Sequence, residues 1–506
     1  MIELVVVVAV IGIITTIVTV SFSSIRAHAR DVQRVTDARE IQVALELYNN
    51  REGTYLDTTD FVPGRPLIGP TSGVTFLKSI PANPTPRTDG GCADTGYAYY
   101  YDSSKNYRLF YCLGGAQGTS AAGINIVSPS GIGGCQANCT GKCSGDADGC
   151  GGTCSNSCSW QTVQAGKPDG LQANYNSLFV YNYVPYVALA PGAAGNGVYV
   201  AKTENGTTSY VGGAAAQSTG ANYFTSLYIY NGTPYVAYQN GADGSKLYVK
   251  KYNGSAWETV GGGAASLGMA AHISLFVYNG MPYVAFRDYN TGVGEELTVR
   301  YYDGSSWQMV GTAGVSDGLK PASTSMYINH DGTIYVAFAK YPSSTPGDGN
   351  SVYVMKYNGS WSYVGTTVYS GAVGYGATSL AVYNDLPYVA YCYGDCNYGA
   401  SGGEIGVKYW TGSAWSQLGT YPCDGVTHYI SLSINNSGTP YIFFPDYTAN
   451  TVYVKKWTGS TWATVGGTIT TGPSWYHSIF LYNNIPFIAY RDTAATSYEL
   501  TVKKYQ

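Results

Sequence analysis

Seven copies of one pattern of about 50 residues constrain this chain more than any other feature of its sequence. The second run of the pattern begins at Pro185, Pro234, Pro282, Ile334, Pro387, Pro440 and Pro486. Each copy holds four short runs, typified by Ser-Leu-x-Val-Tyr, Pro-Tyr-Val-Ala, Leu-x-Val-Lys-x-Tyr and Trp-x-x-Val-Gly. Asn-Gly and Gly-Ser pairs between the runs signal hairpins, because these residues tolerate a positive φ. Four strands repeated at this period predict the four-stranded blades of an all-β propeller.

The phase of the repeats predicts how the ring of blades closes. The fourth runs begin at Trp160, Thr208, Trp257, Trp307, Trp361, Trp415 and Trp462. The last copy stops after its third run, at 500–505, and a solitary fourth run at 160–163 precedes the first copy. We expect this N-terminal run to complete the last blade, which leaves no open sheet edge. The prediction is a seven-bladed β-propeller over 159–506, closed by its N-terminal strand.

Composition agrees with a mainly β protein. The 506 residues include 65 Gly and 50 Tyr, and only 11% are charged. Gly supplies turns, and aromatic and β-branched residues favour strands. We expect the repeated Trp and Tyr to pack between blades. The net charge of −4 offers no basic surface, so no nucleic-acid partner is expected.

Two kinds of connection meet at one face of such a propeller: those from the fourth strand to the next first strand, and those from the second to the third. Aromatic residues precede the first strands, and polar residues follow the second. The candidate ligand-binding residues are Tyr175, Phe224, His272, Arg287, Asp288, Tyr429, Asp446, Tyr476, Arg491 and Asp492. Flat rings beside hydrogen-bonding groups suit the stacking of sugars, so we predict surface glycans as ligands. The alternative is that these rings only cap the blade cores.

Catalysis is not expected. The five histidines are scattered and have no metal-ligand spacing, so neither a metal nor a cofactor is predicted. A glycosidase needs two facing carboxylates, and Asp288, Asp446 and Asp492 share only a predicted face. A membrane-anchored propeller glycosidase is the lesser alternative.

The N-terminus carries the most apolar segment, the uncharged residues 4–25, which is long enough to cross a bilayer. Helical periodicity then continues without proline to Tyr48. Its apolar positions are Val32, Val35, Ala38, Ile41, Leu45 and Tyr48. Arg and acidic residues interleave on the rest of this stretch, as on a solvated or helix-packing face. We predict one helix over about 50 residues, roughly 75 Å long. A cleaved signal peptide and a plain membrane anchor are the alternatives.

This region resembles mature type IV pilins and pseudopilins. The resemblance rests on Met1-Ile2-Glu3-Leu4 through Gly12, on 30–48, on Gly53-Thr54-Tyr55, on 76–84 and on 96–100. It covers 1–130 and implies an α+β module, with a long helix over 1–50 and a small β domain over 51–130. The strand-like runs 97–101, 107–113 and 124–127 resemble the small sheet of that family, and we expect Cys92 and Cys112 to bridge it.

The resemblance implies a structural subunit of an extracellular, type IV pilus-like filament on the cell surface. In that family a prepilin peptidase removes a leader, the new N-terminus is methylated, and the apolar helices form the filament core. The single Glu pairs with the terminal amine of a neighbouring subunit, which makes Glu3 an assembly candidate. Gly12 is the residue at which we expect the apolar helix to melt locally, if it melts at all. The implied partners are identical subunits and the inner-membrane assembly machinery, and the helix sits in the membrane before assembly.

Two departures from the family pattern are informative. The family's Glu is fifth in the mature chain and third here, so we expect two residues and the leader to precede Met1. The family's helix-breaking proline near Val20 is absent. A minor or tip pilin adhesin and a pseudopilin of a secretion system are the alternative assignments.

Six cysteines lie in a Gly- and Ser-rich stretch over 131–158 that has no hydrophobic periodicity. They are Cys135, Cys139, Cys143, Cys150, Cys154 and Cys158. Their spacing lacks the CxxC pairs of zinc sites, so we predict a disulfide-stapled linker in an oxidising compartment. In the propeller, Cys392 and Cys396 lie in one connection and Cys423 follows later in the chain; one disulfide is expected among them, and Cys392 and Cys396 are the candidates. With 11 cysteines in all, at least one is unpaired or bonds between chains.

Overall fold

The structure is a computed structural model, and it divides into two compact units, Met1–Ser157 and Cys158–Gln506. For residues 2–25 it describes the backbone. The described residues are 2–85, 92, 96–103, 106–115, 122–129, 131–134, 158–165, 172–191, 197–216, 222–290, 292, 294–340, 351–371, 373–393, 403–420, 422, 429–467, 469–470, 472, 474–493 and 499–506.

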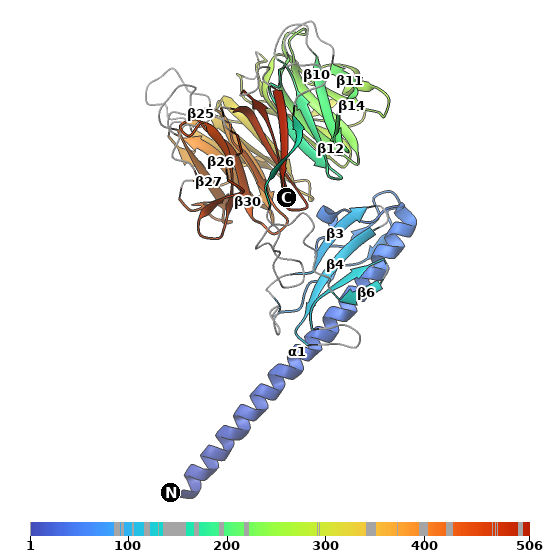
Figure 1. Cartoon of the computed structure of the whole chain (residues 1–506), viewed down its shortest axis with the longest axis vertical. Coiled ribbons are helices and arrows are strands. Elements are labelled where there is room, and N and C mark those ends of the chain that lie inside the picture. The colour runs from blue at the N-terminus through green and yellow to red at the C-terminus, as the bar shows by residue number, and fades with distance from the viewer. Residues whose placement is uncertain are drawn as a thin grey trace. The chain divides into compact units, whose positions relative to one another are not determined.

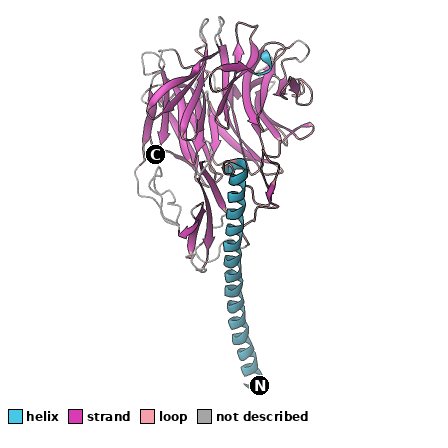
Figure 2. Cartoon of the chain, turned by 90° about the vertical axis from the view of Figure 1, so that its right-hand side faces the viewer, coloured by secondary structure: helices cyan, strands magenta, loops and turns pink. Residues whose placement is uncertain are grey.

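The N-terminal unit is built on one helix and a small sheet (Figure 1). Helix α1 (Ile2–Glu52) is continuous over 51 residues, which confirms the predicted length. Its C-terminal half contacts a sheet of order β3-β4-β5-β6, and its N-terminal half extends away from that sheet (Figure 2). The strands are β3 (Ala98–Ser103), β4 (Asn106–Leu113), β5 (Gly123–Ser128) and β6 (Gly131–Gly134). Smaller elements are η1 (Thr58–Asp60) and the hairpin β1 (Leu67–Ile68) with β2 (Thr75–Leu77).

The sequence analysis placed three of these four strands correctly. The fourth, β6, lies in the segment 131–158 that the sequence analysis assigned to the linker, so the first four residues of that segment belong to the sheet. Three of its four residues are glycine, which gave no strand signal, and β6 forms because β5 offers it an edge. Among the residues whose side chains the structure describes, no helix is long and apolar enough to span a membrane. A disulfide joins Cys92 and Cys112, as expected.

The helix buries the predicted apolar face, including Ala38, Ile41, Leu45 and Tyr48, against the sheet. The burial of its charged residues differs from the predicted solvated or helix-packing face. Asp31, Arg34 and Asp37 are buried, and Val32 is 47% exposed.

Pairing makes this burial tolerable. Arg34 donates to the carboxylate of Asp31 at 2.7 Å and to Asn83 Oδ1 at 2.9 Å. Asp31 also accepts the backbone N–H groups of Gly114 and Gly115. Tyr97 donates to Asp37 at 2.7 Å. A buried charge is retained only where its hydrogen bonds are made, and here those bonds attach the helix to the loops beside it.

In the described residues the larger unit holds seven antiparallel sheets, six of four strands and one of five, which we call blades 1 to 7. Blade 1 is β8 (Ser177–Tyr181), β9 (Val184–Leu189), β10 (Val198–Glu204) and β11 (Thr207–Ala216); blade 2 is β12 (Asn222–Tyr230), β13 (Thr233–Asn240), β14 (Lys246–Tyr252) and β15 (Trp257–Thr259), followed by η2 (Val260–Gly262). Blade 3 is β16 (Ala270–Tyr278), β17 (Met281–Asp288), β18 (Leu297–Tyr302) and β19 (Trp307–Met309); blade 4 is β20 (Pro321–Ile328), β21 (Ile334–Lys340), β22 (Ser351–Tyr357) and β23 (Trp361–Tyr363), with β24 (Tyr369–Ser370) added at β22. Blade 5 is β25 (Val373–Tyr383), β26 (Leu386–Tyr393), β27 (Glu404–Trp410) and β28 (Trp415–Gln417); blade 6 is β29 (Ser431–Ile434), β30 (Pro440–Asp446), β31 (Thr451–Trp457) and β32 (Trp462–Thr464). Blade 7 is β33 (Ser474–Tyr482), β34 (Ile485–Asp492), β35 (Glu499–Tyr505) and β7 (Trp160–Ala165).

The blades form a closed ring. Their first strands contact one another in the order β8, β12, β16, β20, β25, β29 and β33, and β33 contacts β8 again. This cyclic arrangement of four-stranded antiparallel sheets is that of a β-propeller, with the first strands innermost. The closing strand is where the sequence predicts it, since β7 pairs with β35 and Trp160 lies opposite Tyr505.

One serine in each first strand links the blades. Its hydroxyl accepts a backbone N–H from the first strand of the next blade, at 2.9–3.1 Å. The serines are Ser177, Ser226, Ser274, Ser325, Ser379, Ser431 and Ser478, and the last accepts from Leu178 of blade 1. The repeated Ser-Leu pairs therefore form hydrogen bonds at all seven junctions between neighbouring blades.

The repeated Trp and Gly form a second set of links at the fourth strands. Six indoles donate to a backbone carbonyl of the preceding blade; they belong to Trp160, Trp257, Trp307, Trp361, Trp415 and Trp462. Packing of the tryptophans between blades is thus confirmed. Blade 1 has Thr208 at this position. There the preceding blade supplies Gln164, whose side chain accepts from Thr203 at 2.8 Å, so a polar contact replaces the indole at this junction.

The remaining predicted residues fall in different parts of the chain. Glu3 and Gly12 lie in the segment of α1 whose backbone alone is described. Cys158 and Cys392 are disulfide-bonded. The other cysteines of the linker and propeller lie outside the described residues; they are Cys135, Cys139, Cys143, Cys150, Cys154, Cys396 and Cys423.

Candidate ligand-binding site

Four bulky residues at the entries to first strands have a left-handed backbone. Tyr175, Phe224 and His272 have φ of 53°, and Tyr476 has φ of 55°. The strand pairing shifts register at three of these positions, which marks a bulge in each. A bulky residue held at positive φ costs about 1–3 kcal/mol, and such strain gathers at functional sites. Each occupies the second position before the linking serine of its blade.

The rings at this position of five blades are in contact, since Tyr429 also lies two residues before a linking serine. Tyr429 contacts Tyr476 with ring centroids 5.1 Å apart, and Tyr476 contacts Tyr175 at 4.8 Å. Tyr175 contacts Phe224 at 5.5 Å, and Phe224 contacts His272 at 4.9 Å. We call these five residues the aromatic arc. All five are half-buried, and because they enter the innermost strands, the arc curves around the propeller axis at one face.

The arc carries no formal charge at neutral pH. Burial and the neighbouring tyrosines raise the pKa of Tyr175 and of Tyr429, and the hydroxyl of Tyr476 hydrogen-bonds to both. Burial, and to a smaller extent the charge of Arg287, lowers the pKa of His272 to about 4. The arc therefore offers ring faces, phenolic hydroxyls and a neutral imidazole.

A second row of rings lines the axis two residues beyond the linking serines. Phe480 contacts Phe179 at 4.5 Å, and Phe179 contacts Tyr228 at 5.0 Å. The row continues through Phe276 to Tyr327, at 4.7 and 5.3 Å. The sequence analysis missed this row. The signal for it is the variable position of the Ser-Leu-x pattern, which is aromatic in these five blades, Ala381 in blade 5 and Ser433 in blade 6.

The two candidate arginines lie beside aromatic rings. The Arg491 guanidinium is 5.2 Å from the ring centroid of Tyr476 and 5.3 Å from that of Trp475, and it donates to Asn174. Asn174 in turn donates to Pro191 O at 2.6 Å. Arg491 thus connects the Tyr476 ring of the arc to Asn174 of blade 1.

Arg287 has a comparable place in blade 3. Its guanidinium lies 4.6 Å from the ring centroid of Tyr289 and donates to Glu295. Glu295 also pairs with Lys320 at 3.3 Å, which links blade 3 to blade 4. The charge of Arg287 reaches His272, so this arginine borders the end of the arc.

The three candidate carboxylates end second strands at the same face. Asp288 is buried and accepts the N–H of Asn290 at 3.0 Å, and burial raises its pKa. Asp446 accepts the N–H of Ala449 at 2.8 Å, which shapes its own turn. Asp492 lies opposite Ser474 in the strand register. Within the described part of the chain, no group of three His, Cys, Asp or Glu side chains is placed to hold a metal ion.

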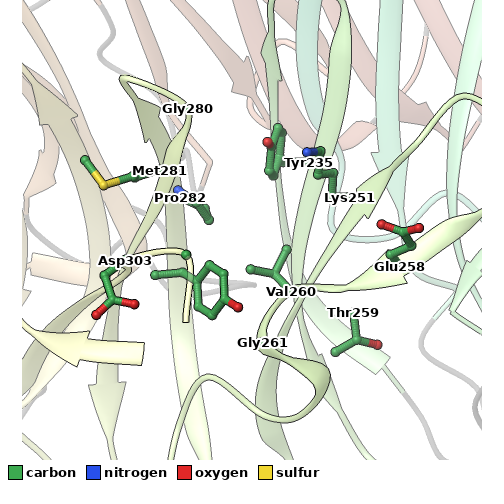
Figure 3. Close-up of a pocket in the computed structure, with 12 residues that line it drawn as sticks. Tyr235, Lys251, Glu258, Thr259, Val260, Gly261, Gly280, Met281, Pro282 and Asp303 are labelled. Atoms are coloured by element: carbon green, nitrogen blue, oxygen red, sulfur yellow. The ribbon is translucent and has the colours of Figure 1, made fainter. Parts of the chain in front are cut away.

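A separate hollow of about 360 Å³ lies between blades 2 and 3 (Figure 3). It opens among the hairpins of the opposite face. Its walls include Tyr235, Val260 and Tyr302, with Lys251 5.7 Å from the ring centroid of Tyr235. Asp303 at its edge accepts from Ser305, Ser306 and Gln308, and these bonds lower its pKa. This carboxylate therefore shapes its own turn.

No family model matches the chain, and no curated protein matches it. Several solved structures are similar to it. The SapL1 lectin in complex with alpha methyl fucoside is 14% identical, with a TM-score of 0.41, over 60% of this chain and 98% of that one. The fucose-specific lectin from Aleuria aurantia is 15% identical, with a TM-score of 0.37, over 55% and 93%. The polysaccharide lyase Uly1 is 10% identical, with a TM-score of 0.45, over 69% and 98%.

Proposed function

We propose that this chain is a structural subunit of an extracellular, type IV pilus-like filament, and that its propeller binds glycans without turning them over. The aromatic arc carries the binding half of the proposal. Glycine adopts a positive φ without strain. If the backbone conformation were the only requirement at these positions, we would expect glycine there. Four strained positions hold an aromatic ring or an imidazole instead, and their rings meet at one face.

Glycans are the ligand class that suits this surface. One face of a sugar ring presents C–H groups that pack against aromatic rings, while its hydroxyls require hydrogen-bond partners. The rings of Tyr175, Phe224 and Tyr476 supply the packing surface. The hydroxyl of Tyr476 and the two phenols to which it hydrogen-bonds, those of Tyr175 and Tyr429, supply hydrogen-bond partners. A concave apolar site with a few placed polar groups is the usual form of a small-ligand site.

The binding half is tested with the full chain on a glycan array, comparing Tyr476→Gly with Tyr183→Ala. Tyr183 is an exposed tyrosine in the hairpin between β8 and β9, on the opposite face. Glycine relieves the positive φ at position 476 while it removes the ring. We expect glycan binding to fall at least tenfold, with the free energy of unfolding changed by about 1 kcal/mol or less. Tyr183→Ala should bind normally.

A different result would assign the arc to stability. If Tyr476→Gly unfolds far more easily and still binds every glycan that the parent chain binds, the rings serve only as caps. Turnover of an arrayed glycan would instead support a propeller glycosidase.

The filament half of the proposal is supported by Glu3, by the uninterrupted helix and by the resemblance of 1–130 to type IV pilins. A lone carboxylate in an apolar helix is costly unless a partner neutralises it. We propose the terminal amine of the neighbouring subunit as that partner. The other partners are the inner-membrane assembly machinery and the prepilin peptidase, and the helix lies in the membrane until assembly.

Filament counts by electron microscopy test this half. Glu3→Ala should abolish or strongly reduce filaments, whereas Glu40→Ala, which removes an exposed acid of the same helix, should leave their number unchanged. An undiminished count from Glu3→Ala would contradict the pairing. The composition of purified filaments separates a major subunit from a minor or tip pilin, since the chain would be abundant in the first case and scarce in the second.

A further inference from the structure

We infer that the binding site continues from the aromatic arc into the axis of the propeller, where it takes the end of a linear, unbranched glycan. This inference rests on the proposed function. It follows from the second row of rings, which we call the axial row. Its members are Phe480, Phe179, Tyr228, Phe276 and Tyr327.

The axis is open to solvent at the level of the axial row. The blades of a propeller surround a central channel, and alternate residues of a strand point to opposite sides. The residue directly after each linking serine is only 4–7% exposed, so this side of the strand is packed between blades. The next residue is partly exposed in every blade, as is each linking serine. Solvent therefore reaches the axial row along the channel.

Two neighbouring blades leave an opening in the axial row. Five blades carry a ring there, and the ring centroids of neighbours are 4.5–5.3 Å apart. Blade 5 has Ala381 at this position and blade 6 has Ser433, and both fill much less of the channel than a phenyl ring does. In the closed ring of seven, blades 5 and 6 lie opposite blade 2. The opening therefore faces the ring of Tyr228.

This opening combines the two kinds of group that a sugar needs. Tyr228 offers an aromatic ring, against which the C–H face of a sugar packs. On the other side of the channel Ser433 offers a hydroxyl, and Ala381 leaves room. The same combination of rings and hydroxyls occurs in the arc, so one glycan chain is suited to both places.

The arc and the axial row lie on the same innermost strands. In blades 7, 1, 2 and 3 a ring of the arc precedes a ring of the axial row by four residues, as Tyr175 precedes Phe179. Four residues of a strand span about 13 Å, a depth of several sugar units. The end of an unbranched chain can enter the channel to this depth. The middle of a long chain, or a branch point, would bring a second arm into the channel with it.

Blocked forms of one glycan test the inference on the full chain. The probe is the best-bound linear oligosaccharide of a mixed array that is long enough to reach from the arc to the axial row. It carries a bulky group at one end, at the other end, or at both. We expect the doubly blocked form to bind about tenfold more weakly than the unblocked one, because it loses the sugar stacked in the opening. One of the two singly blocked forms should keep its affinity.

The possible results separate this inference from the proposed function. Undiminished binding of the doubly blocked form would overturn entry by a chain end and leave the proposed function standing. Weakened binding of both singly blocked forms would show that both ends are bound, and would overturn it as well. If the parent chain binds no glycan of the array in any form, the proposed function itself fails.

A variant that closes the opening locates the effect at blades 5 and 6. Ala381→Phe with Ser433→Phe gives these blades the ring that blades 1, 3 and 7 carry at the same position, and it leaves the arc unaltered. We expect this double variant to bind the unblocked oligosaccharide about tenfold more weakly. A single sugar of the same kind, which needs only the arc, should bind as tightly as it does to the parent chain.

The matched control is Ser433→Ala, which keeps the opening. It should weaken binding of the oligosaccharide at most about threefold, through loss of the hydroxyl. Unchanged oligosaccharide binding by a folded double variant would overturn the inference. Circular dichroism reports whether the double variant folds, and the comparison of blocked probes on the parent chain decides if it does not.

Discussion

A glycine and the indole beside it are the smallest unit that joins two blades. Gly261 has φ of 74°, and a Cβ built on it would lie 2.9 Å from Nε1 of Trp307. The indole donates to the carbonyl of Val260 at 3.3 Å. At six of the seven junctions a Val-Gly or Leu-Gly pair thus serves the tryptophan of the next blade, because the glycine permits the left-handed turn and leaves room for the ring.

We predict that Gly261→Ala destabilises the propeller more than Gly262→Ala does. Gly262 has φ of 70°, and a Cβ added to it would meet no atom within 4 Å, so it carries the same backbone strain without the indole. Alanine at positive φ costs about 1 kcal/mol at either site, and the displaced indole adds about 1–3 kcal/mol at Gly261. Urea denaturation of the two variants measures the difference. Equal losses would mean that the ring moves aside freely.

His272 gives the aromatic arc a pH-dependent stability. Its pKa is 6.5 in the unfolded chain and about 4 in the folded one, because burial opposes the charged imidazole. The unfolded chain therefore binds more protons between these values, and stability falls as the pH is lowered through them.

We predict that replacing this histidine removes the effect. Phe224 occupies the equivalent position of blade 2 with the same φ, so His272→Phe should fit. Between pH 7 and pH 5 the parent chain should lose about 1–2 kcal/mol more than the variant does. Urea unfolding at both pH values gives this double difference. Identical pH dependence of the two chains would show that the imidazole is not held neutral.

The innermost strand of each blade is a sheet edge, and the linking serines supply partners for it. An edge strand has N–H groups that lack a neighbouring strand, and burying them without acceptors is costly. The Ser431 hydroxyl accepts the N–H of Ile479 at 3.0 Å, as the serines of the other blades do for their neighbours. A short polar residue is therefore required at one position of an otherwise apolar and aromatic strand.

We predict that Ser431→Ala costs about 1–3 kcal/mol of unfolding free energy, since it leaves the Ile479 N–H without its acceptor. Ser433 lies two residues along the same strand and faces the axis, so Ser433→Ala should change stability by about 0.5 kcal/mol or less. Chemical denaturation of both variants measures the two changes in unfolding free energy. A similar small effect from both would show that water replaces the hydroxyl.

Ring closure at blade 7 decides whether the propeller is a single stable unit. Strand β7 comes from the N-terminal end of the unit and β35 from the C-terminal end, and Ser159 and Gln506 hydrogen-bond through their backbones. Without β7, blade 7 would present β35 as an exposed edge, and the indole of Trp160 would no longer reach Val465.

We predict that deleting 159–165 from the full chain leaves a propeller that aggregates through this edge. Adding the same segment after Gln506, through an Asn-Gly-Ser turn like those of other blades, should restore a dispersed, folded chain. Light scattering after size exclusion, in detergent for both forms, reports the change. A deleted chain as dispersed and as stable as the parent would show that closure by β7 is dispensable.

The sequence by itself determined the elements that repeat or are locally encoded. Periodicity gave the long helix and the number of blades, and the solitary run at Trp160 gave the closing strand, because hairpin turns and alternating side chains act over a few residues. The same patterns identified Tyr175 and Tyr476 as candidates at one face.

The tertiary structure decided which residues meet, because closure of the ring joins positions that are far apart along the chain. The Ser478 hydroxyl, for example, accepts the backbone N–H of Leu178, which lies 300 positions earlier in the sequence. Only the closed ring gathers five rings into one arc and reveals the second row along the axis. Burial of Arg34 and Asp31 was likewise unpredictable from helix periodicity, since it depends on Asn83, Gly114 and Gly115 from distant loops. Local pattern sets secondary structure, whereas the partner that makes a buried charge or a strained ring tolerable comes from elsewhere in the fold.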